Sequence, residues 1–372
     1  MACADDHGFM TEALRLAERG LYTTTPNPRV GCLIVKDGKI VGRGFHARAG
    51  EPHAEAVALR EAAERACGAT VYVTLEPCSH YGRTPPCADA LVAAGVRRVV
   101  VAMEDPNPRV RGRGMERLRQ AGIAVECGVL EEEARALNIG FVSRMTRGRP
   151  WVRMKIAASL DGRTALPDGR SQWITGEAAR RDAHHWRARS CAVLTGIGTV
   201  REDDPRLTVR YVETPRQPLR VVVDSRLETP ESARVLAGAP VLIAYARDDQ
   251  DAAKRLQDRG AEVLCVPNPS GKVDLPTLFR LLGERGINEV LVEAGTRLNG
   301  SLLKEALVDE LLVYLAPCLL GDAARGMASL AVPDDLSARL ALRLRDVRLV
   351  GGDLRILAEV VQEKIGPTPG RE

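Results

Sequence analysis

The sequence predicts two successive α/β domains in one chain. Its 372 residues are about twice the length that a single hydrophobic core usually serves. In both halves, short β-rich runs alternate with amphipathic segments, a pattern that predicts mostly parallel sheets covered by helices. Between the halves the apolar pattern lapses at residues 144–150, RMTRGRP, so we expect one domain over 1–146 and a second over 147–372.

The first half begins with a helix and a hairpin. Apolar residues at helical spacing predict the helix over residues 9–19. The runs VGCLIV and IVGRGF flank the turn KDGK, and Asp37-Gly38 between two β-rich runs is a strong signal for a hairpin. Helices expected at 53–66, 87–94 and 114–122 then alternate with strands at 70–75, 97–103 and 123–128.

The second half repeats this alternation from residue 151 onward. Strands are expected at 151–159, 191–196, 219–224, 239–245, 261–266, 288–295 and 310–317. Helices are expected at 176–189, 251–259, 275–285 and 297–306. Two further strands, near 340–349 and 354–361, complete the predicted sheet.

Composition and charge weigh against several classes of protein. The net charge of +4 is spread over both halves, which argues against a dedicated nucleic-acid arm. No stretch approaches about 18 consecutive apolar residues, and Met1 to Glu12 lacks the pattern of a secretory signal, so we expect neither a membrane span nor export. The chain has nine cysteines, an odd number that fits a disulfide framework poorly, so we expect reduced thiols and a cytoplasmic protein. Because most of these cysteines stand in apolar runs, we expect most of them to be small core residues.

One histidine and two cysteines have the pattern of a catalytic zinc site. His53 opens an expected helix, Cys78 follows a strand, and Cys87 opens the next helix. Three such ligands leave the fourth tetrahedral position of Zn²⁺ to water, whose pKa the metal lowers to about 7. Glu55, two residues after His53, is placed to take the proton of that water and deliver it to a leaving amine.

The spacing departs from the general signature of zinc base deaminases, H-x-E followed by P-C-x-x-C. Eight residues, SHYGRTPP, separate Cys78 from Cys87, and their polar side chains are candidates for substrate contact. Taken singly, His53 is more often a loop or core histidine than a ligand, and the two cysteines can both be core residues. The joint pattern, with each piece between a strand and a helix, favours a zinc deaminase. Loop or supporting roles, rather than ligand roles, are expected for His7, His46 and His80.

Long motifs in both halves resemble those of the bifunctional riboflavin-biosynthesis deaminase/reductases. In the first half they are TPNPRVGC (25–32), GFHARAGEPHAE (44–55), LEPCSHYGRTPPC (75–87) and DPNPRVRGRGMERLRQAGI (105–123). In the second half they are KIAASLDGRTA (155–165), SQWITG (171–176), TVREDDPRLTVR (199–210) and VEAGTRLNGSLL (292–303). The resemblance covers almost the whole chain, and the insertion between the two cysteines is a feature of that family.

The resemblance implies a cytidine-deaminase-like three-layer domain followed by a dihydrofolate-reductase-like α/β domain. The first would deaminate a diaminopyrimidinone carrying a ribosylamino 5′-phosphate, with zinc on His53, Cys78 and Cys87 and with Glu55 as the proton carrier. The second would use NADPH to reduce the ribosyl side chain of the product to ribityl. Asn27 would lie near the pyrimidine, although from the sequence alone it is equally a turn residue before proline.

In the second half, the resemblance implies a cofactor site and a substrate site. Contacts to NADPH are implied for Ala157, Trp173, Thr199, Asp203, Ser225, Gly295, Thr296, Arg297, Leu298, Asn299, Gly300 and Ser301. Contacts to the substrate are implied for Ser171, Arg187, Leu207, Arg210 and Glu293. Candidates for the acid–base chemistry of ring opening and hydride transfer are Lys155 and Asp203.

Residue chemistry supports part of this assignment. The second half has no G-x-G-x-x-G after a strand, so a doubly wound dinucleotide-binding fold is not supported. The turn 295–301 between a strand and a helix can hold a phosphate on its N–H groups, although any such turn favours glycine. Arg187 and Arg210 suit a ribose 5′-phosphate, and Glu293 stands at the carboxyl end of a strand, where ligands of α/β proteins bind. Trp173 by itself is as readily a core residue.

Two other functions stay open at this point. One is a deaminase that acts on a base in RNA, with the second half as a binding module; the even charge and the 3 % of aromatic residues weigh against it. The other is a non-catalytic protein in which zinc stabilises an interaction domain. We expect an enzyme whose substrate is a small phosphorylated pyrimidine. We also expect this enzyme to form a homo-oligomer and to contact neither nucleic acid nor membrane.

Overall fold

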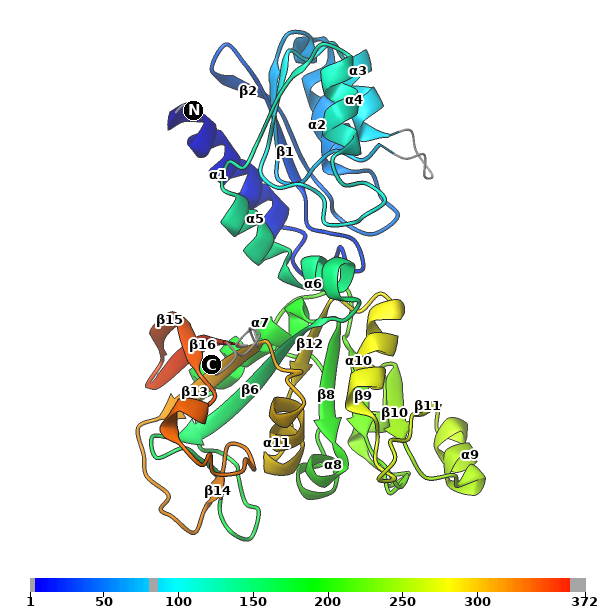
Figure 1. The fold of residues 1–372 in the computed structure, drawn as a ribbon, viewed down its shortest axis with the longest axis vertical. Helices are drawn as coiled ribbons and strands as arrows, with labels where there is room; N and C mark the ends of the chain where they lie inside the picture. Colours follow the sequence, from blue (N-terminus) through cyan, green and yellow to red (C-terminus); the bar gives the residue numbers. More distant parts are fainter. Residues whose placement is uncertain (1–3, 80–85, 362–372) are drawn as a thin grey trace, which may run out of the picture. The chain divides into compact units, whose positions relative to one another are not determined.

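The computed structural model describes residues 4–79 and 86–361 of the chain. The chain divides into two compact units. The first comprises Met1–Pro150 with Thr214–Arg216 and Leu282–Asn288, and the second comprises Trp151–Glu213, Gln217–Leu281 and Glu289–Glu372. Each unit is built on a sheet of its own (Figure 1).

A five-stranded sheet in the order β2-β1-β3-β4-β5 forms the centre of the first unit. Its strands are β1 (Gly31–Lys36), β2 (Lys39–Phe45), β3 (Thr70–Val73), β4 (Arg98–Val101) and β5 (Ala124–Cys127). The predicted hairpin is confirmed, and Asp37 and Gly38 have the positive φ values, 51° and 71°, that a tight two-residue turn requires. β3, β4 and β5 are parallel, so their carboxyl ends lie at one edge of the sheet.

Helices cover both faces of this sheet and make three layers (Figure 1). α1 (Ala4–Glu18) and α5 (Glu131–Leu137) share one apolar core with the sheet. A second core on the other face joins the sheet to α2 (Ala54–Ala62), α3 (Cys87–Ala93) and α4 (Arg113–Gln120). A Cβ on Gly44 would lie 2.1 Å from the carbonyl oxygen of Ala54, so glycine lets α2 pack directly on the hairpin. A 3₁₀ turn, Ala63–Ala66, follows α2.

Two expectations for the first half need correction. The first helix begins at Ala4 rather than at residue 9, because the buried carboxylate of Asp6 accepts hydrogen bonds from Tyr72 and Arg98 and fixes the first turn to the sheet. The stretch 131–147, to which we assign no element from the sequence, forms α5 and α6 (Ile139–Arg147), so the second helix runs into the lapse expected at residues 144–150.

A nine-stranded sheet in the order β11-β10-β9-β8-β12-β6-β13-β16-β15 forms the centre of the second unit. Its strands are β6 (Trp151–Ser159), β8 (Ala192–Gly196), β9 (Leu219–Val223), β10 (Val241–Tyr245), β11 (Glu262–Cys265), β12 (Glu289–Val292), β13 (Glu310–Ala316), β15 (Leu342–Val350) and β16 (Asp353–Val360). The strands from β11 to β13 are parallel, whereas β16 and β15 are antiparallel to their neighbours. The carboxyl ends of β6, β8 and β12 therefore meet at one edge.

Helices flank this second sheet as well. α7 (Glu177–Arg189) and α9 (Gln250–Asp258) share an apolar core with the sheet, and α10 (Leu275–Glu284) and α11 (Thr296–Lys304) lie on its other face (Figure 1). The strands and helices expected for this half are confirmed, with ends shifted by a few residues. The structure adds the helix α8 (Ile197–Asp203), two 3₁₀ turns (Arg234–Leu236 and Leu336–Ala338) and a two-stranded arm of β7 (Arg163–Ala165) and β14 (Arg325–Gly326).

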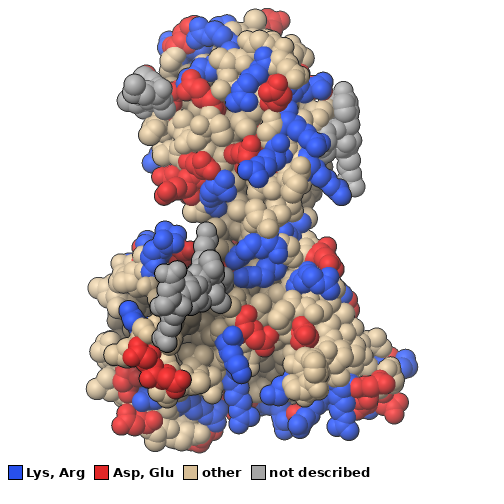
Figure 2. Space-filling model, in the orientation of Figure 1, with Lys and Arg blue, Asp and Glu red and all other residues tan. Residues whose placement is uncertain are grey.

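The surface is mixed in charge. Figure 2 shows Lys and Arg side chains beside Asp and Glu side chains over the visible face of each unit. In the described part of the chain, no helix is long and apolar enough to cross a membrane.

The eight described cysteines are all free, but the expectation that most lie in the core is wrong. Four of them are exposed: Cys67, Cys127, Cys265 and Cys318. Cys127 and Cys265 end β5 and β11, which are edge strands, and an edge strand is covered less completely than a central one.

Candidate zinc and reductase sites

The three predicted zinc ligands meet beside the first turns of two helices. His53 is the N-cap of α2, Cys87 is the first residue of α3, and Cys78 follows β3. Nδ1 of His53 lies 3.6 Å from Sγ of Cys78 and 3.3 Å from Sγ of Cys87. Within residues 4–79 and 86–361, this is the one group of three or more His, Cys, Asp or Glu side chains whose ligand atoms converge, all within 4.8 Å of one another.

These distances fit a tetrahedral zinc ion. Bond lengths of about 2.3 Å for Zn–S and about 2.0 Å for Zn–N place a nitrogen and a sulfur ligand about 3.5 Å apart. The N–H of Cys87 donates to Sγ of Cys78 at 3.3 Å. The hydrogen bond with the Cys87 side chain lowers the pKa of Cys78, against the opposing effect of burial, and the same contact together with burial raises the pKa of Cys87. Cys78 is therefore the thiol of this pair that more readily forms the thiolate that zinc binding requires.

Glu55 lies in the first turn of α2 and faces the three ligands. Glu55 is 4 % exposed, and its carboxyl group interacts with His53, Cys78 and Cys87. Burial raises the pKa of Glu55 to about 7. A carboxyl group with this pKa can both hold and release a proton near neutral pH, as an acid–base catalyst must.

Asn27 reaches the cluster through His46. Its Nδ2 lies 3.1 Å from Nε2 of His46, and Nδ1 of His46 lies 3.1 Å from the carbonyl oxygen of Pro52. This pattern fits a neutral ring that accepts from Asn27 at Nε2 and donates at Nδ1. Burial lowers the pKa of His46, which favours the neutral form. The His46 ring meets the His53 ring edge-on, 5.5 Å away, so this supporting histidine brings Asn27 to the ligand set. Most of the insertion, residues 80–85 including His80, lies outside the described residues.

A second cluster of charged side chains lies where the carboxyl end of β12 adjoins the middle of β6. Arg187 of α7 pairs with Glu293, the residue after β12, through Nε–Oε1 at 2.5 Å and Nη2–Oε2 at 2.9 Å. Burial acts to raise the pKa of Glu293, but the charge and hydrogen bonds of Arg187 lower it to about 2. Lys155 on β6 interacts with both charges, and burial lowers its pKa. The structure thus brings three predicted residues together.

Two side chains of α7 hold the segment that carries Leu207 and Arg210. Arg187 donates from Nη1 to the carbonyl oxygen of Thr208 at 3.0 Å. Nδ1 of His184 accepts the backbone N–H of Arg210 at 3.1 Å, and His184 is 4 % exposed. Leu207 has a φ of 53°, a left-handed conformation that a branched side chain rarely adopts. His184 lies in no motif that points to a site, and the one signal for it in the sequence is its position one helical turn before Arg187 on α7.

The predicted run 295–301 divides into two parts. Gly295 is the N-cap of α11 and makes no side-chain cap hydrogen bond, so the first turn of the helix offers backbone N–H groups. Asn299 and Gly300 face the protein instead. Nδ2 of Asn299 donates to the carbonyl oxygen of Met327. A Cβ on Gly300 would lie 2.1 Å from the carbonyl oxygen of Ser329. Leu298 packs beside Gly196, and Arg297 and Ser301 are joined by a hydrogen bond within the helix.

Four more predicted cofactor and substrate residues lie on α8 and on the loop before α7. Ser171 donates to Oδ1 of Asp203, the last residue of α8, at 3.4 Å, and burial raises the pKa of Asp203. Thr199 of α8 approaches Gly295, with its Oγ1 3.7 Å from an ideal Cβ there. Trp173 is 68 % exposed, with the Arg180 guanidinium 4.6 Å from its ring centroid, so the alternative of a core tryptophan is wrong.

Two more predicted cofactor residues lie on or beside the sheet. Ser225 follows β9, and its Oγ accepts the N–H of Val273 at 3.1 Å. Ala157 lies on β6, two residues after Lys155.

Family comparisons match both halves of the chain. Residues 4–103 match the cytidine and deoxycytidylate deaminase zinc-binding region, and residues 150–356 match the RibD C-terminal domain. The riboflavin biosynthesis protein RibD of Escherichia coli (strain K12) is 50 % identical over 361 residues, which cover 94 % of this chain and 98 % of the relative. RibD of Aquifex aeolicus (strain VF5) is 44 % identical over 357 residues, which cover 94 % and 97 %.

Solved structures also match nearly the whole chain. Acinetobacter baumannii RibD, form 1, has a TM-score of 0.89 and 48 % identity, covering 96 % of this chain and 99 % of the other. A diaminohydroxyphosphoribosylaminopyrimidine deaminase/5-amino-6-(5-phosphoribosylamino)uracil reductase from Thermotoga maritima has a TM-score of 0.84 and 33 % identity, with the same coverage. These matches confirm the predicted pair of folds and set aside the two alternative functions. The chain belongs to the RibD family of bifunctional deaminase/reductases of riboflavin biosynthesis.

Proposed function

We propose that the first unit deaminates a diaminopyrimidinone carrying a ribosylamino 5′-phosphate and that the second unit reduces the ribosyl side chain of the product to ribityl. The observation that carries the proposal is the convergence of three zinc ligands on the buried Glu55. The described activities of the Thermotoga maritima relative support the choice of substrates. We place the division between the two activities at residues 146 and 147.

In the deaminase, the chain's own residues orient the ring and move the proton. Zinc, when held by His53, Cys78 and Cys87, supplies an activated water by lowering the pKa of water to about 7. Glu55 accepts a proton at its carboxylate and returns it to the leaving amine, which departs as ammonia. Asn27, held by His46, offers its amide to the pyrimidine.

In the reductase, we assign substrate binding to the cluster around Arg187 and Glu293. Arg210, whose backbone is fixed to His184, binds the 5′-phosphate with its guanidinium group together with Arg187. Ser171 and Leu207 complete the substrate contacts. Lys155, beside Glu293, provides the proton for opening the ribose ring, with Asp203 as the second candidate.

The second unit has features that fit NADPH, which supplies the hydride when bound. The uncapped first turn of α11, from Gly295 to Leu298, suits a cofactor phosphate, and Thr199 lies beside it. The exposed Trp173 offers an aromatic face. Asn299 and Gly300, which face the protein, hold this turn of α11 in place rather than contact the phosphate themselves. Ala157, Asp203, Ser225 and Ser301 complete the proposed contacts.

We further propose a cytoplasmic homo-oligomer joined through β15. This strand is an edge of the nine-stranded sheet, and a bulge between Leu344 and Asp346 keeps its four large apolar side chains on one face. They are Leu342, Leu344, Val347 and Leu349, and each is at least 46 % exposed. A second copy of the chain would cover both the apolar face and the edge. Light scattering should show an oligomer that L344E with L349E converts to monomer; an unchanged mass would contradict the proposal.

The proposed function is tested by removing the metal and assaying both steps. A chelator should abolish ammonia release from the phosphoribosylated diaminopyrimidinone, whereas NADPH oxidation with the deaminated compound should continue. An RNA oligonucleotide should release no ammonia under the same conditions. Ammonia release that survives complete zinc removal, or release from RNA alone, would overturn the proposal.

A further inference from the structure

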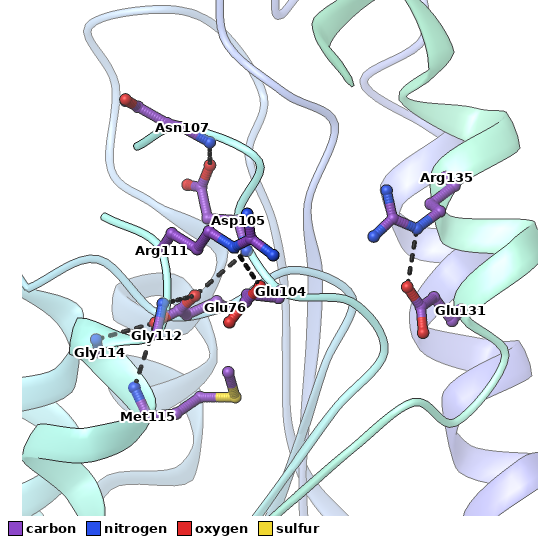
Figure 3. A network of polar contacts seen from close by, with 10 residues as sticks. All are labelled: Glu76, Glu104, Asp105, Asn107, Arg111, Gly112, Gly114, Met115, Glu131 and Arg135. Atoms are coloured by element: carbon purple, nitrogen blue, oxygen red, sulfur yellow. Dashed lines mark hydrogen bonds and ion pairs between the residues drawn. The ribbon is translucent and has the colours of Figure 1, made fainter. Parts of the chain in front are cut away.

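Glu76 is a buried carboxylate whose hydrogen-bond partners come from one segment of backbone. The residue is 3 % exposed and lies just after β3. Oε1 accepts the N–H groups of Gly114 at 2.9 Å and Met115 at 3.3 Å. Oε2 accepts those of Gly112 at 2.9 Å and Asp105 at 3.1 Å. Figure 3 shows the carboxylate enclosed by these donors, so the four acceptor sites of an ionised carboxylate are all used.

Two glycines let the segment 105–115 close around this carboxylate. Gly112, the N-cap of α4, has a φ of 76°, which glycine adopts without strain. A Cβ on Gly114 would lie 1.9 Å from the carbonyl oxygen of Pro77, so only glycine allows the first turn of α4 to approach this closely. The N-terminus of α4 also favours a negative charge at this point. The backbone N–H groups of segment 105–115 therefore form an anion-binding site, here called the Glu76 cradle, and the bound anion is the carboxylate of Glu76.

The cradle lies one residue from a zinc ligand. Pro77, which has a restricted φ, is the only residue between Glu76 and Cys78. The carbonyl oxygen of Cys78 accepts the N–H of Ala88 in α3 at 3.1 Å. Cys78 is thus fixed on one side by α3 and on the other by the Glu76 cradle. The same cradle fixes the turn that starts at Asp105, shortly after β4, at the sheet edge where Cys78 follows β3.

We propose that Glu76 is a positioning residue of the deaminase, which locks the segment 105–115 to the turn that carries Cys78 and thereby sets the geometry of the zinc site. The proposal rests on the deaminase function proposed above. The carboxylate form is essential to it, because an amide in place of one oxygen would direct an N–H₂ group at two backbone N–H donors. Groups that orient metal ligands in this way typically change metal affinity or activity by about 10- to 100-fold when they are lost.

The test compares full-length E76Q with E131Q. Glu131 is a matched control in the same unit, since its side chain is 42 % exposed and its ion pair among the described residues is with Arg135, one helical turn away (Figure 3). We expect E76Q to raise the zinc dissociation constant, measured by competition with a chelator, by about 10- to 100-fold. Its kcat for ammonia release at saturating zinc should also fall, whereas NADPH oxidation should match the wild type. E131Q should resemble the wild type in all three measurements.

Several outcomes overturn the proposal. Wild-type zinc affinity and kcat in E76Q would do so. A lower melting temperature with unchanged zinc affinity would also do so, because it indicates a purely structural role. If E76Q does not fold, G114A provides the second variant, since it keeps the carboxylate but displaces the cradle; unchanged zinc affinity in G114A would then refute the proposal. Zinc affinity is measured without substrate, so a wild-type protein that binds zinc but releases no ammonia would refute the proposed function instead.

Discussion

Arg187 and Glu293 form a bidentate ion pair at the carboxyl end of β12, with side chains only 13 % and 12 % exposed. Because the pair is largely buried, removing one partner leaves an uncompensated charge and costs about 3–5 kcal/mol. E293Q should therefore lower the free energy of unfolding at pH 7 by several kcal/mol and abolish NADPH oxidation. The exposed pair of Glu202 and Arg325 is the control, and E202Q should change stability by less than about 1 kcal/mol.

The same pair predicts a pH dependence of stability. The pKa of Glu293 is about 2 in the folded protein and 4.5 ordinarily, so its ionisation stabilises the fold fully above pH 4.5. This contribution, on the order of 3 kcal/mol, is lost as the pH falls from 4.5 towards 2. Urea unfolding of the wild type and E293Q should show a stability gap that narrows over this range. A gap that stays constant from pH 7 to pH 3 would contradict the assignment.

His184 should control substrate affinity through the backbone of Arg210. H184F removes the acceptor of the Arg210 N–H, and an unsatisfied buried donor costs about 1–3 kcal/mol. We expect H184F to raise the KM for the phosphorylated substrate about tenfold, with NADPH affinity unchanged. H184N keeps an acceptor near the position of Nδ1 and should restore most of the affinity. Equal KM values for H184F and H184N would show that the hydrogen bond does not matter.

Gly300 should be required for packing rather than for helix flexibility. An alanine Cβ there would lie 2.1 Å from the carbonyl oxygen of Ser329, so G300A should destabilise the protein by about 1–3 kcal/mol. Gly198 in α8 has open space around its Cβ position, so G198A should be neutral or stabilise by up to about 1 kcal/mol. Chemical denaturation of both variants provides the check. Stabilisation by G300A would mean that α11 does not contact Ser329.

The zinc site could be predicted from the sequence because its ligands are rare residue types at a characteristic spacing. To group His53, Cys78 and Cys87, it was enough to expect that each of them adjoins the end of a strand or a helix. The structure brings their ligand atoms together. The element order of both units could be predicted for a similar reason, since alternating apolar patterns reflect burial on each sheet.

Features that depend on tertiary contacts could not be predicted in this way. Glu76 bonds to backbone N–H groups 29 to 39 residues away, which carry no side-chain signal. The sequence of β6 is mostly apolar, yet Arg153 on this strand is buried. Its guanidinium carbon lies 4.4 Å from the ring centroid of Trp186, and it forms ion pairs with Glu289 and Glu310. Such pairs join distant segments, and a single sequence does not indicate which segments meet.

The central claim is that Glu55 carries the proton in a zinc-dependent deamination while a separate unit performs the reduction. E55Q keeps the shape of the side chain but removes its acid–base function. We expect E55Q to bind zinc as the wild type does, to release ammonia at least about 10²-fold more slowly, and to reduce the deaminated substrate at the wild-type rate. Ammonia release by zinc-loaded E55Q at the wild-type rate would contradict the account.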